Sequence, residues 1–389
     1  MTVELAAGAD LSKVMCGVGG SAVEIGRIMV AGVEVWPGLV HIEDDFNRLN
    51  GDVGANYDYT PGAGFGSQRP VIFGNAMRAG VPTSSAPGNV CFGILGHVKR
   101  MRRENRRIQG VLSGNPALLN AMLVLKANEG LTASAEMNIV SQGDPHAAGI
   151  SNVLNSALGA TRGVYTPSLV TSGDTCGLEC WVLGTDTVYI AFRIRSGVRL
   201  NLCAWRDTGS AVIPADGSFM RCGPTTAAQY NAQYGPSWDS WSADDLPNYV
   251  VQAFASRGAT KTATAWPASN GAWVDVQGWT ADTGSYPGSE ILDDGRSLFL
   301  AGGKAGTTFN VSAPFSGGSS SRQHQLRIVR SDDGTVIAAS NTVTANSGTC
   351  TISGATDTTA DLQRYKLQSR TTGTSGGGNF TAGGYFRIT

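Results

Sequence analysis

The chain has few charged residues and no long apolar run. Asp, Glu, Lys and Arg make up 15% of its 389 residues, against about 25% in an average globular protein. The formal net charge is −1, so no overall attraction to nucleic acid or to an anionic membrane is expected. The longest apolar runs, such as Ala121–Leu125, are far too short to span a bilayer. We therefore expect no nucleic-acid partner and no membrane insertion.

Sequence signals for catalysis, metals and cofactors are also missing. The histidines are far apart and belong to no known nucleophile motif: His41, His97, His146 and His324. Cys176 and Cys180 have no second Cys or His pair nearby at zinc-ligand spacing. Seven cysteines, an odd number without dense spacing, fit buried thiols made in the cytosol. We predict no metal, no cofactor and no enzyme activity.

Four pairs of adjacent acidic residues raise the question of a glycosidase: Asp44–Asp45, Asp244–Asp245, Asp293–Asp294 and Asp332–Asp333. Such enzymes need two carboxyl groups facing one substrate. Neighbouring residues of a strand point to opposite faces, so these pairs are not expected to act together. Most of them also stand beside Gly or Asn, where Asp forms turns. A glycan hydrolase is kept as an alternative.

Glycine is abundant instead, with 52 residues, and Ser and Thr are also frequent. This composition favours short strands joined by tight turns. We predict an all-β fold of tandem β-sandwiches with a small N-terminal β arm. The expected units are an N-terminal docking arm (1–40), a β-sandwich (41–230), an aromatic connector (231–262) and a C-terminal β-sandwich (263–389).

Segments of alternating or β-branched residues supply the expected strands. In the first sandwich these are Val71–Phe73, Val90–Leu95, Ile108–Leu112, Met122–Lys126, Ala135–Ile139, Glu179–Leu183, Thr187–Ile194 and Leu200–Trp205. In the second they are Ala272–Val276, Ser297–Leu300, Thr308–Val311, Gln323–Val329, Val336–Ala339, Cys350–Ile352, Arg364–Arg370 and Tyr385–Thr389. Their spacing of roughly 8–12 residues is that of a sandwich.

The connector carries aromatic and acidic side chains and a Ser-led turn. We expect a short helical turn at Ser242–Pro247, begun by a serine cap. Sugar-binding sites stack rings on aromatic faces and use carboxylates for hydroxyl groups, so one hypothesis is a ligand patch of Tyr234, Trp238, Asp239 and Trp241. The alternative is packing between domains, which Trp and Tyr also suit.

One basic run stands out: Lys99, Arg100, Arg102, Arg103, Arg106 and Arg107. Guanidinium forks suit acidic glycans or phosphate, so Arg100, Arg102, Arg103, Arg106 and Arg107 form a candidate anion or interface patch. The run lacks the interleaved aromatics of single-strand nucleic-acid sites. The alternatives are an edge strand whose charges prevent aggregation and an ionic contact between subunits.

Two motifs in the N-terminal part carry a family resemblance. Val33–Pro37 ends a strand, and it is followed by Asp44-Asp45-Phe46-Asn47-Arg48 and an Asn50-Gly51 turn. This order resembles the minor tail proteins of long-tailed phages that infect actinobacteria. The resemblance implies a concanavalin-like or laminin-G-like sandwich after the motif, with residues 96–110 departing from the pattern because of the basic run. It also implies that residues 1–40 dock into a tail.

The C-terminal strand rhythm, with Phe299-Leu300 ahead of Gly302-Gly303, resembles jelly rolls of the complement C1q and tumour-necrosis-factor type. In that family the jelly rolls form homotrimers. We therefore expect a virion structural protein of the tail tip, made in the host cytoplasm, with other tail proteins and a host cell-envelope glycan as partners. A capsid fibre or decoration protein is the first alternative. The N-terminus has no basic region ahead of an apolar core, which counts against a secreted adhesin.

Overall fold

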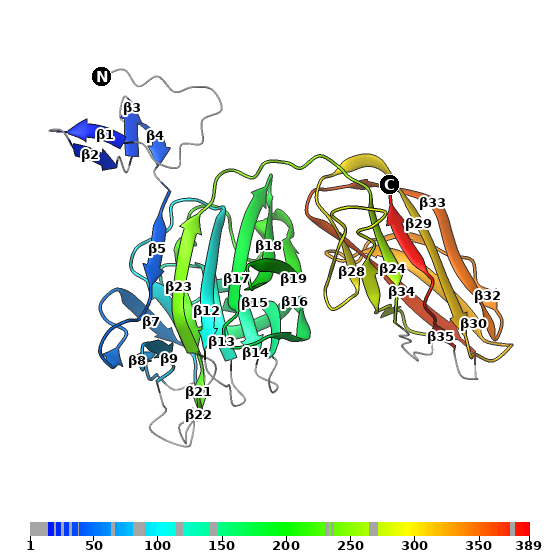
Figure 1. Ribbon diagram of the computed structural model, residues 1–389, viewed down its shortest axis with the longest axis horizontal. Coiled ribbons are helices and arrows are strands. Elements are labelled where there is room, and N and C mark those ends of the chain that lie inside the picture. The colour runs from blue at the N-terminus through cyan, green and yellow to red at the C-terminus, as the bar shows by residue number, and fades with distance from the viewer. Residues whose placement is uncertain are drawn as a thin grey trace.

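The computed structural model describes the backbone of residues 15–18, 21–24, 27–30, 33–37, 39–63, 67–80, 90–113, 120–140, 146–229, 233–234, 237–263, 271–373 and 378–389. Side chains are described from residue 39 onward, except at 90–91, 140, 146, 158–159, 164–169, 229 and 233–234. These residues form strands and a single 3-10 turn, Thr208–Ser210. None of the described segments is a helix long and apolar enough to cross a membrane. The predicted all-β fold of tandem β-sandwiches is confirmed (Figure 1).

The N-terminal segment forms two short hairpins. Strand β1 (Met15–Val18) pairs with β2 (Ser21–Glu24), and β3 (Arg27–Val30) pairs with β4 (Val33–Pro37). Figure 1 shows both hairpins beyond the start of β5, outside the two sandwiches. The strands agree with the predicted β arm, whereas its docking role stays a prediction.

The first sandwich has a nine-stranded and a five-stranded sheet. The larger sheet contains β5 (His41–Asp44), β6 (Gly51–Asp52), β8 (Val71–Phe73), β9 (Ala76–Arg78), β12 (Arg106–Ser113), β17 (Thr175–Leu183), β18 (Asp186–Arg195), β19 (Val198–Asp207) and β23 (Ser237–Asp245). The smaller contains β13 (Asn120–Ala127), β14 (Ser134–Val140), β15 (His146–Leu154), β16 (Ala157–Val170) and β20 (Arg221–Thr226). Smaller pairings join β7 (Tyr57–Pro61) to β11 (Gly93–His97), and β10 (Val90–Cys91) to β21 (Ala228–Gln229) and β22 (Gln233–Tyr234).

Alternate residues of these strands form one core between the two sheets. Ile108, Leu178 and Tyr189 of the larger sheet meet Leu123 and Met137 of the smaller. Each cysteine whose side chain is described is a buried free thiol. Four lie in the first sandwich and one in the second: Cys176, Cys180, Cys203, Cys222 and Cys350. The expectation of buried thiols is therefore confirmed for these five. Burial raises the pKa of Cys222 to about 12, and it raises the pKa of Cys350 to about 12 as well.

The predicted aromatic connector at 231–262 is wrong at both ends, where strands of the two sandwiches lie, and holds for the stretch between them. Ser237–Asp245 is a strand in the middle of the nine-stranded sheet, paired with β12 and β5, where a helical turn was expected. Its alternating buried positions give it a period of two, which outweighs the helix-start signal of Ser242. The connection between the sandwiches runs from Leu246 to Ser256, and the next strand, β24, begins at Arg257 rather than after 263.

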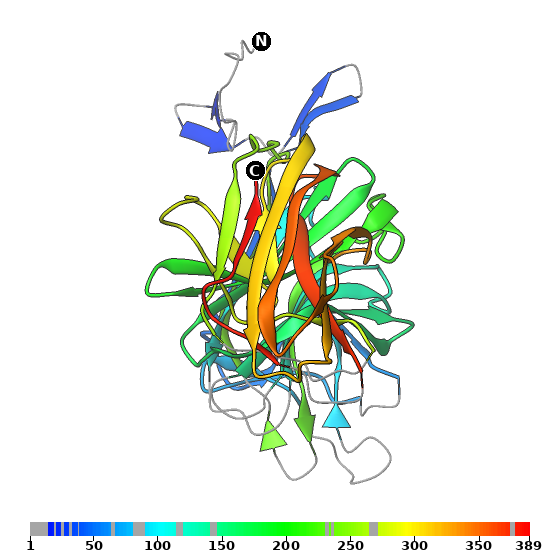
Figure 2. The same ribbon diagram turned by 90° about the vertical axis from the view of Figure 1, so that its right-hand side faces the viewer.

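The second sandwich has a six-stranded and a seven-stranded sheet. The first contains β24 (Arg257–Lys261), β26 (Trp279–Ala281), β29 (Lys304–Ser316), β33 (Ser347–Thr359), β35 (Asn379–Phe380) and β36 (Tyr385–Ile388). The second contains β25 (Val274–Asp275), β27 (Glu290–Leu292), β28 (Ser297–Leu300), β30 (Gln323–Arg330), β31 (Val336–Ala339), β32 (Val343–Thr344) and β34 (Gln363–Thr372). Figure 2 looks onto this sandwich, with β36 in red beside the yellow β29.

The order of its principal strands is that of a jelly roll. In chain order the principal strands are β24, β28, β29, β30, β31, β33, β34 and β36, and successive strands change sheet except for β30 and β31, which form a hairpin in one sheet. Side by side, one sheet has the order β24, β36, β29, β33, and the other has β28, β34, β30, β31. Numbered along the chain from one to eight, these orders are 1-8-3-6 and 2-7-4-5. This arrangement of two Greek keys agrees with the predicted C-terminal jelly roll.

The two sandwiches pack directly on each other. Val188, Ile190 and Ala204 on the outer face of the nine-stranded sheet meet Leu292 and Phe299 of the second sandwich in one apolar cluster. From the connection, Tyr249 packs edge-on against Trp181, with ring centroids 5.3 Å apart. The expectation that aromatic residues of the connector pack the domains together is therefore confirmed for Tyr249.

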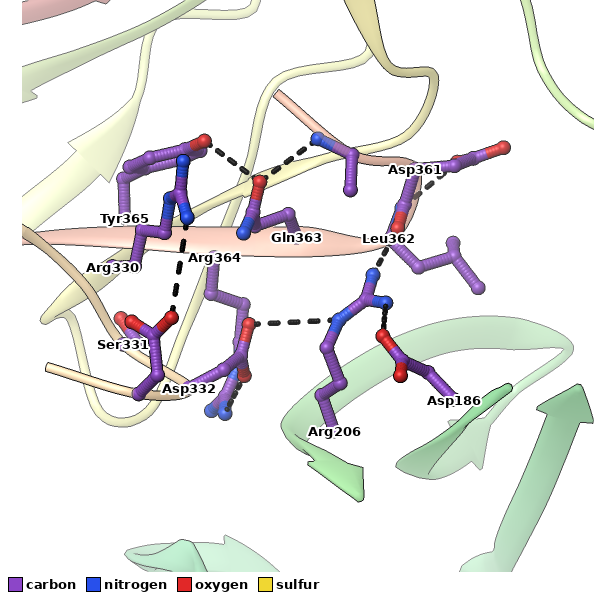
Figure 3. Close-up of polar contacts among 12 residues, drawn as sticks. Asp186, Arg206, Arg330, Ser331, Asp332, Asp361, Leu362, Gln363, Arg364 and Tyr365 are labelled. Carbon is purple, nitrogen blue, oxygen red and sulfur yellow. Dashed lines mark hydrogen bonds and ion pairs between the residues drawn. The ribbon is translucent and has the colours of Figure 1, made fainter. Parts of the chain in front are cut away.

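A polar network borders this apolar contact (Figure 3). Arg206 of β19 is bound to Asp186 at 2.8 Å and donates a hydrogen bond to the backbone oxygen of Asp361 in the second sandwich. Its Nε also lies 4.0 Å from Asp332. The amide of Asp293 donates to the backbone oxygen of Leu202 at 3.1 Å. Hydrogen bonds from both domains thus fix their orientation.

Candidate functional site

A groove of about 620 Å³ lies on the first sandwich, where β5 runs beside β23. Its lining comes from the segment 43–48 with Asn56 and His97, from β12 and β17, and from β23. The second sandwich covers β18 and β19 of the same sheet. The groove therefore occupies the half of this sheet away from the domain interface.

Short polar side chains at alternate strand positions form one side of the groove. Gln109 lies opposite Ser242, and Val111 lies opposite both Ser240 and Thr175. Their sequence neighbours face the core, so the strands alternate polar and apolar residues in the usual way. The result is a set of hydroxyl and amide groups on three neighbouring strands, interrupted by Val111, which can exchange hydrogen bonds with a polar ligand.

Asp44 organises the opposite side. Its carboxylate accepts two hydrogen bonds from Arg48, at 2.6 and 3.0 Å, and one from the Tyr57 hydroxyl at 2.7 Å. It also accepts the backbone amide of Phe46 at 2.8 Å, which stabilises a turn with Phe46 in the left-handed region at φ 51° and its ring fully buried. Asp44, Phe46 and Arg48 thus stand two residues apart because the Asp44 carboxylate binds the Phe46 amide and the Arg48 side chain in one turn.

This arrangement sets the charge of the groove wall. Burial alone would raise the pKa of Asp44, but the hydrogen bonds from Arg48, Tyr57 and the Phe46 amide outweigh it and lower the pKa. Burial lowers the pKa of His97, whose ring stands edge-on to Tyr57 at 5.2 Å between centroids. At neutral pH the wall presents an ionised Asp44 paired with Arg48, and an uncharged His97.

Each carboxylate that lines the groove already has a partner. Glu43 contacts His41 at 3.1 Å, Asp44 binds Arg48, and Asp45 accepts the amide of Asn47 at 3.0 Å. Glycoside hydrolysis needs one protonated and one ionised carboxyl group on opposite sides of a bond. The groove offers hydroxyl, amide and carboxylate groups, which can exchange hydrogen bonds with the hydroxyl groups of a ligand.

Of the four adjacent acidic pairs, only Asp244–Asp245 lies within a strand, and its two carboxylates diverge as predicted. Asp44 and Asp45 follow one another at the end of β5 and both line the groove, so the prediction is wrong for that pair. Asp244 contacts His41 at 2.6 Å and Arg107 at 3.2 Å on the outer face of β23. Asp245 is buried and accepts the amides of Val40, Arg102 and Arg103. One carboxylate belongs to the surface, whereas the other holds two loops together.

The predicted sugar-stacking patch is not formed, because its tryptophans are core residues. Trp238 has no exposed surface and donates its indole N–H to the backbone oxygen of Thr225 at 3.1 Å. A Cβ on Gly110 would lie 2.8 Å from the Trp238 ring, so glycine makes room for it. Trp241 is 2% exposed and donates to Tyr57, although it borders the groove. Asp239 is exposed, and the Tyr234 side chain lies outside the described residues.

The basic run does not form one patch either. Arg106 is fully buried and donates to the backbone oxygen of Phe219 at 2.8 Å, and Arg107 is paired with Asp244. Both lie on β12, a central strand and not an edge strand. Arg100 is exposed and paired with Glu129 at 2.8 Å, while exposed Arg102 and half-buried Arg103 belong to the loop held by Asp245. The predicted anion patch is therefore wrong for Arg106, whereas for Arg107, which is half-buried, it stays a prediction.

Sequence reasoning missed the polar groove residues Gln109, Thr175, Ser240 and Ser242. A usable signal was present, because Ser240 and Ser242 alternate with Trp241 and Ala243 in a two-residue period. That pattern indicates a half-buried strand.

Comparison with known proteins identifies similar folds but no family. No protein-family model matches the chain, and no curated protein matches it. Among solved structures, a legume lectin-like domain from Entamoeba histolytica is similar at 10% identity, over 49% of this chain and 91% of that one, with a TM-score of 0.32. The CBM2 module of the evolved Dit of Lactobacillus casei BL23 phage J-1 is similar at 9% identity, over 54% and 96%, with a TM-score of 0.35.

A third structure, Bacteroides ovatus xyloglucan PUL GH43B, is similar at 16% identity over 52% of this chain, with a TM-score of 0.34. The chain covers 39% of that protein's length. At such identities and TM-scores these similarities carry no conclusion about ligand or activity.

Proposed function

We propose that the chain is a virion protein of the minor tail protein type found in long-tailed actinobacteriophages, and that it binds a host cell-envelope glycan through the groove. The first sandwich supplies the binding surface, the N-terminal arm docks into the tail, and the jelly roll assembles as a homotrimer. Its action is binding without bond cleavage.

One observation carries the proposal. The motif by which the sequence resembles phage minor tail proteins, residues 44–48, builds the charged wall of the groove. The other side is a set of amide and hydroxyl groups on three neighbouring strands. Glycan ligands present many hydroxyl groups, so a polar groove with paired charges matches their chemistry better than that of an apolar ligand.

Titration of the full chain with purified envelope polysaccharide from the host tests the binding. We expect saturable binding by calorimetry, and absence of heat at millimolar sugar concentrations would refute it. Immunogold labelling of intact particles tests the location. Gold at the tail tip is expected, whereas gold over the head would favour the capsid fibre or decoration alternative.

The hydrolase alternative is tested on the same polysaccharide. If the groove only binds, prolonged incubation releases no reducing ends, and release above a buffer blank would contradict the proposal. Light scattering tests the trimer. A mass near the 40.4 kDa of one chain would argue against it, and about three times that value is expected.

A further inference from the structure

Two arginines of the second sandwich share one tryptophan. Trp273 lies just before β25, half-buried at the outer face of the seven-stranded sheet. The guanidinium carbon of Arg327, from β30, lies 4.4 Å from its ring centroid, and that of Arg370, from β34, lies 4.7 Å from it. Two cations are thus held against the same ring, an arrangement in which each is attracted by the ring but repelled by the other.

Neutral side chains, not carboxylates, position both guanidinium groups. Arg327 donates twice to the amide oxygen of Gln368, at 2.8 and 2.6 Å. Arg370 donates twice to the amide oxygen of Gln325, at 3.0 and 2.9 Å. A guanidinium group has five N–H donors, so these bonds orient each fork without neutralising it.

Positive charge is in excess at this face. The nearby carboxylate, Asp275, is paired with Lys366 at 2.9 Å, so among the described residues three cations accompany one carboxylate. Burial, followed by the charge of Arg370, lowers the pKa of Arg327 and outweighs the opposite influence of Asp275. Residues 262–272, which lead to Trp273, contain no Asp or Glu. Asp275 therefore offsets the repulsion between the two arginines only in part.

A small cleft of about 120 Å³ opens beside Arg370. Its lining consists of side chains able to hydrogen-bond: Gln323, Gln325, Thr342, Arg370 and Thr372. A water molecule takes up about 30 Å³ of liquid, so the cleft has room for a single small oxyanion.

We propose that the cleft beside Arg370 is a binding site for an oxyanion, the carboxylate or phosphate group of an acidic polymer. Arg327 does not line the cleft, but it is held against the same tryptophan ring as Arg370 and adds positive charge nearby. Guanidinium forks match the planar oxygen pairs of these groups. A bound anion would also relieve the repulsion between the two arginines. The site lies on a different sandwich from the groove and does not depend on it. Only the identification of the polymer as a host envelope glycan rests on the proposed function.

Calorimetry on the full chain tests the site with three defined polymers at low salt. Polygalacturonate presents carboxylates, poly(glycerol phosphate) presents phosphates, and dextran is neutral. We expect at least one acidic polymer to bind and dextran not to bind at this site. Raising NaCl from about 20 to about 300 mM should weaken the binding severalfold, because screening reduces attraction between charges near the surface.

The variant Arg370→Gln should weaken binding of the acidic polymer at least tenfold, and Arg327→Gln should weaken it less, because Arg370 lines the cleft and Arg327 does not. Lys304→Gln is the matched control, since Lys304 is an exposed cation on the same sandwich, 4.9 Å from the ring of Phe254, and it should bind as the wild type does. Equal binding by all three variants would overturn the site, as would failure of both acidic polymers to bind the wild type at low salt.

Two further measurements keep the test decisive. Should an arginine variant fail to fold, inorganic phosphate is expected to displace the acidic polymer from the wild type, and lack of displacement counts against the site. Ser242→Trp, which fills the groove of the first sandwich, should leave binding of the acidic polymer unchanged. A failure of the groove and a failure of the arginine site are therefore distinguishable.

Discussion

Arg364 is the buried cation on which the second sandwich and its contact with the first are expected to depend most. Its side chain is 6% exposed and lies between Asp293 at 2.8 Å, which is 3% exposed, and Asp332 at 2.6 Å, which is 4% exposed. Burial opposes its charge, but Asp293 and Asp332 outweigh that effect and raise the pKa of Arg364. Replacing Arg364 with Met keeps a similar volume but leaves buried Asp293 without a cation and leaves Asp332 with Arg206 alone, 4.0 Å away.

Breaking a buried ion pair by removing one partner costs about 3–5 kcal/mol. Asp293 also sits in the left-handed region, at φ 58°, and its amide bonds to Leu202 of the first sandwich. We therefore expect Arg364→Met to lower the free energy of unfolding by about 3–5 kcal/mol. Urea denaturation followed by circular dichroism measures this value.

Two further variants separate the ionic effect from general damage. Arg100→Met removes an arginine whose partner Glu129 is equally close but exposed, and should cost no more than about 1 kcal/mol. The triple variant Arg364→Met, Asp293→Asn, Asp332→Asn should recover most of the lost stability, because the uncompensated charges are gone. A cost for Arg364→Met as small as that for Arg100→Met would refute the reasoning.

Three other perturbations test the first sandwich by urea denaturation. Asp44→Asn should lower the free energy of unfolding by about 1–3 kcal/mol, since it weakens the hydrogen bonds from Arg48 and Tyr57. An unchanged urea midpoint would show that Asp44 does not hold this turn together. Burial raises the pKa of Glu136 from 4.5 to about 7, so its ionisation opposes folding. Stability should therefore fall by on the order of 3 kcal/mol as pH rises from about 4.5 to about 7, and Glu136→Gln should abolish that fall; the same pH dependence in both proteins would contradict this. Trp238→Ala should cost about 3–5 kcal/mol because it empties a filled core site, whereas a surface ligand residue would cost little.

Several strands could be predicted from the sequence together with their ends. Ser297–Leu300 and Val336–Ala339 form strands with the predicted ends, and Gln323–Val329 is one residue short of β30. Alternation explains the success for β30, which buries every second residue over most of its length. It does not explain the other two, because Ser297–Leu300 is buried throughout and Val336–Ala339 has no buried residue, so their prediction rested on strand propensity. The jelly-roll order was predicted from resemblance, and the structure agrees with it.

Burial could not be predicted from residue type. Trp238 and Asp239 were grouped as a ligand patch although neighbouring strand residues point to opposite faces, a rule already applied to the adjacent acidic pairs. Arg106 was assigned to the surface because of its charge, yet bonds to Phe219 and Met220 allow it to be buried. These partners lie more than 110 positions away, so only the tertiary fold brings them together.

The groove is the central claim, and blocking it tests that claim most directly. Ser242 stands between Gln109 and Glu43 on the neighbouring strands, so Ser242→Trp should fill the space where a glycan would lie. Thr351→Trp places the same ring at an exposed strand position of the second sandwich and serves as the control. Titration with host envelope polysaccharide should show binding lost in Ser242→Trp and kept in Thr351→Trp. Equal affinity of the two variants would contradict the account.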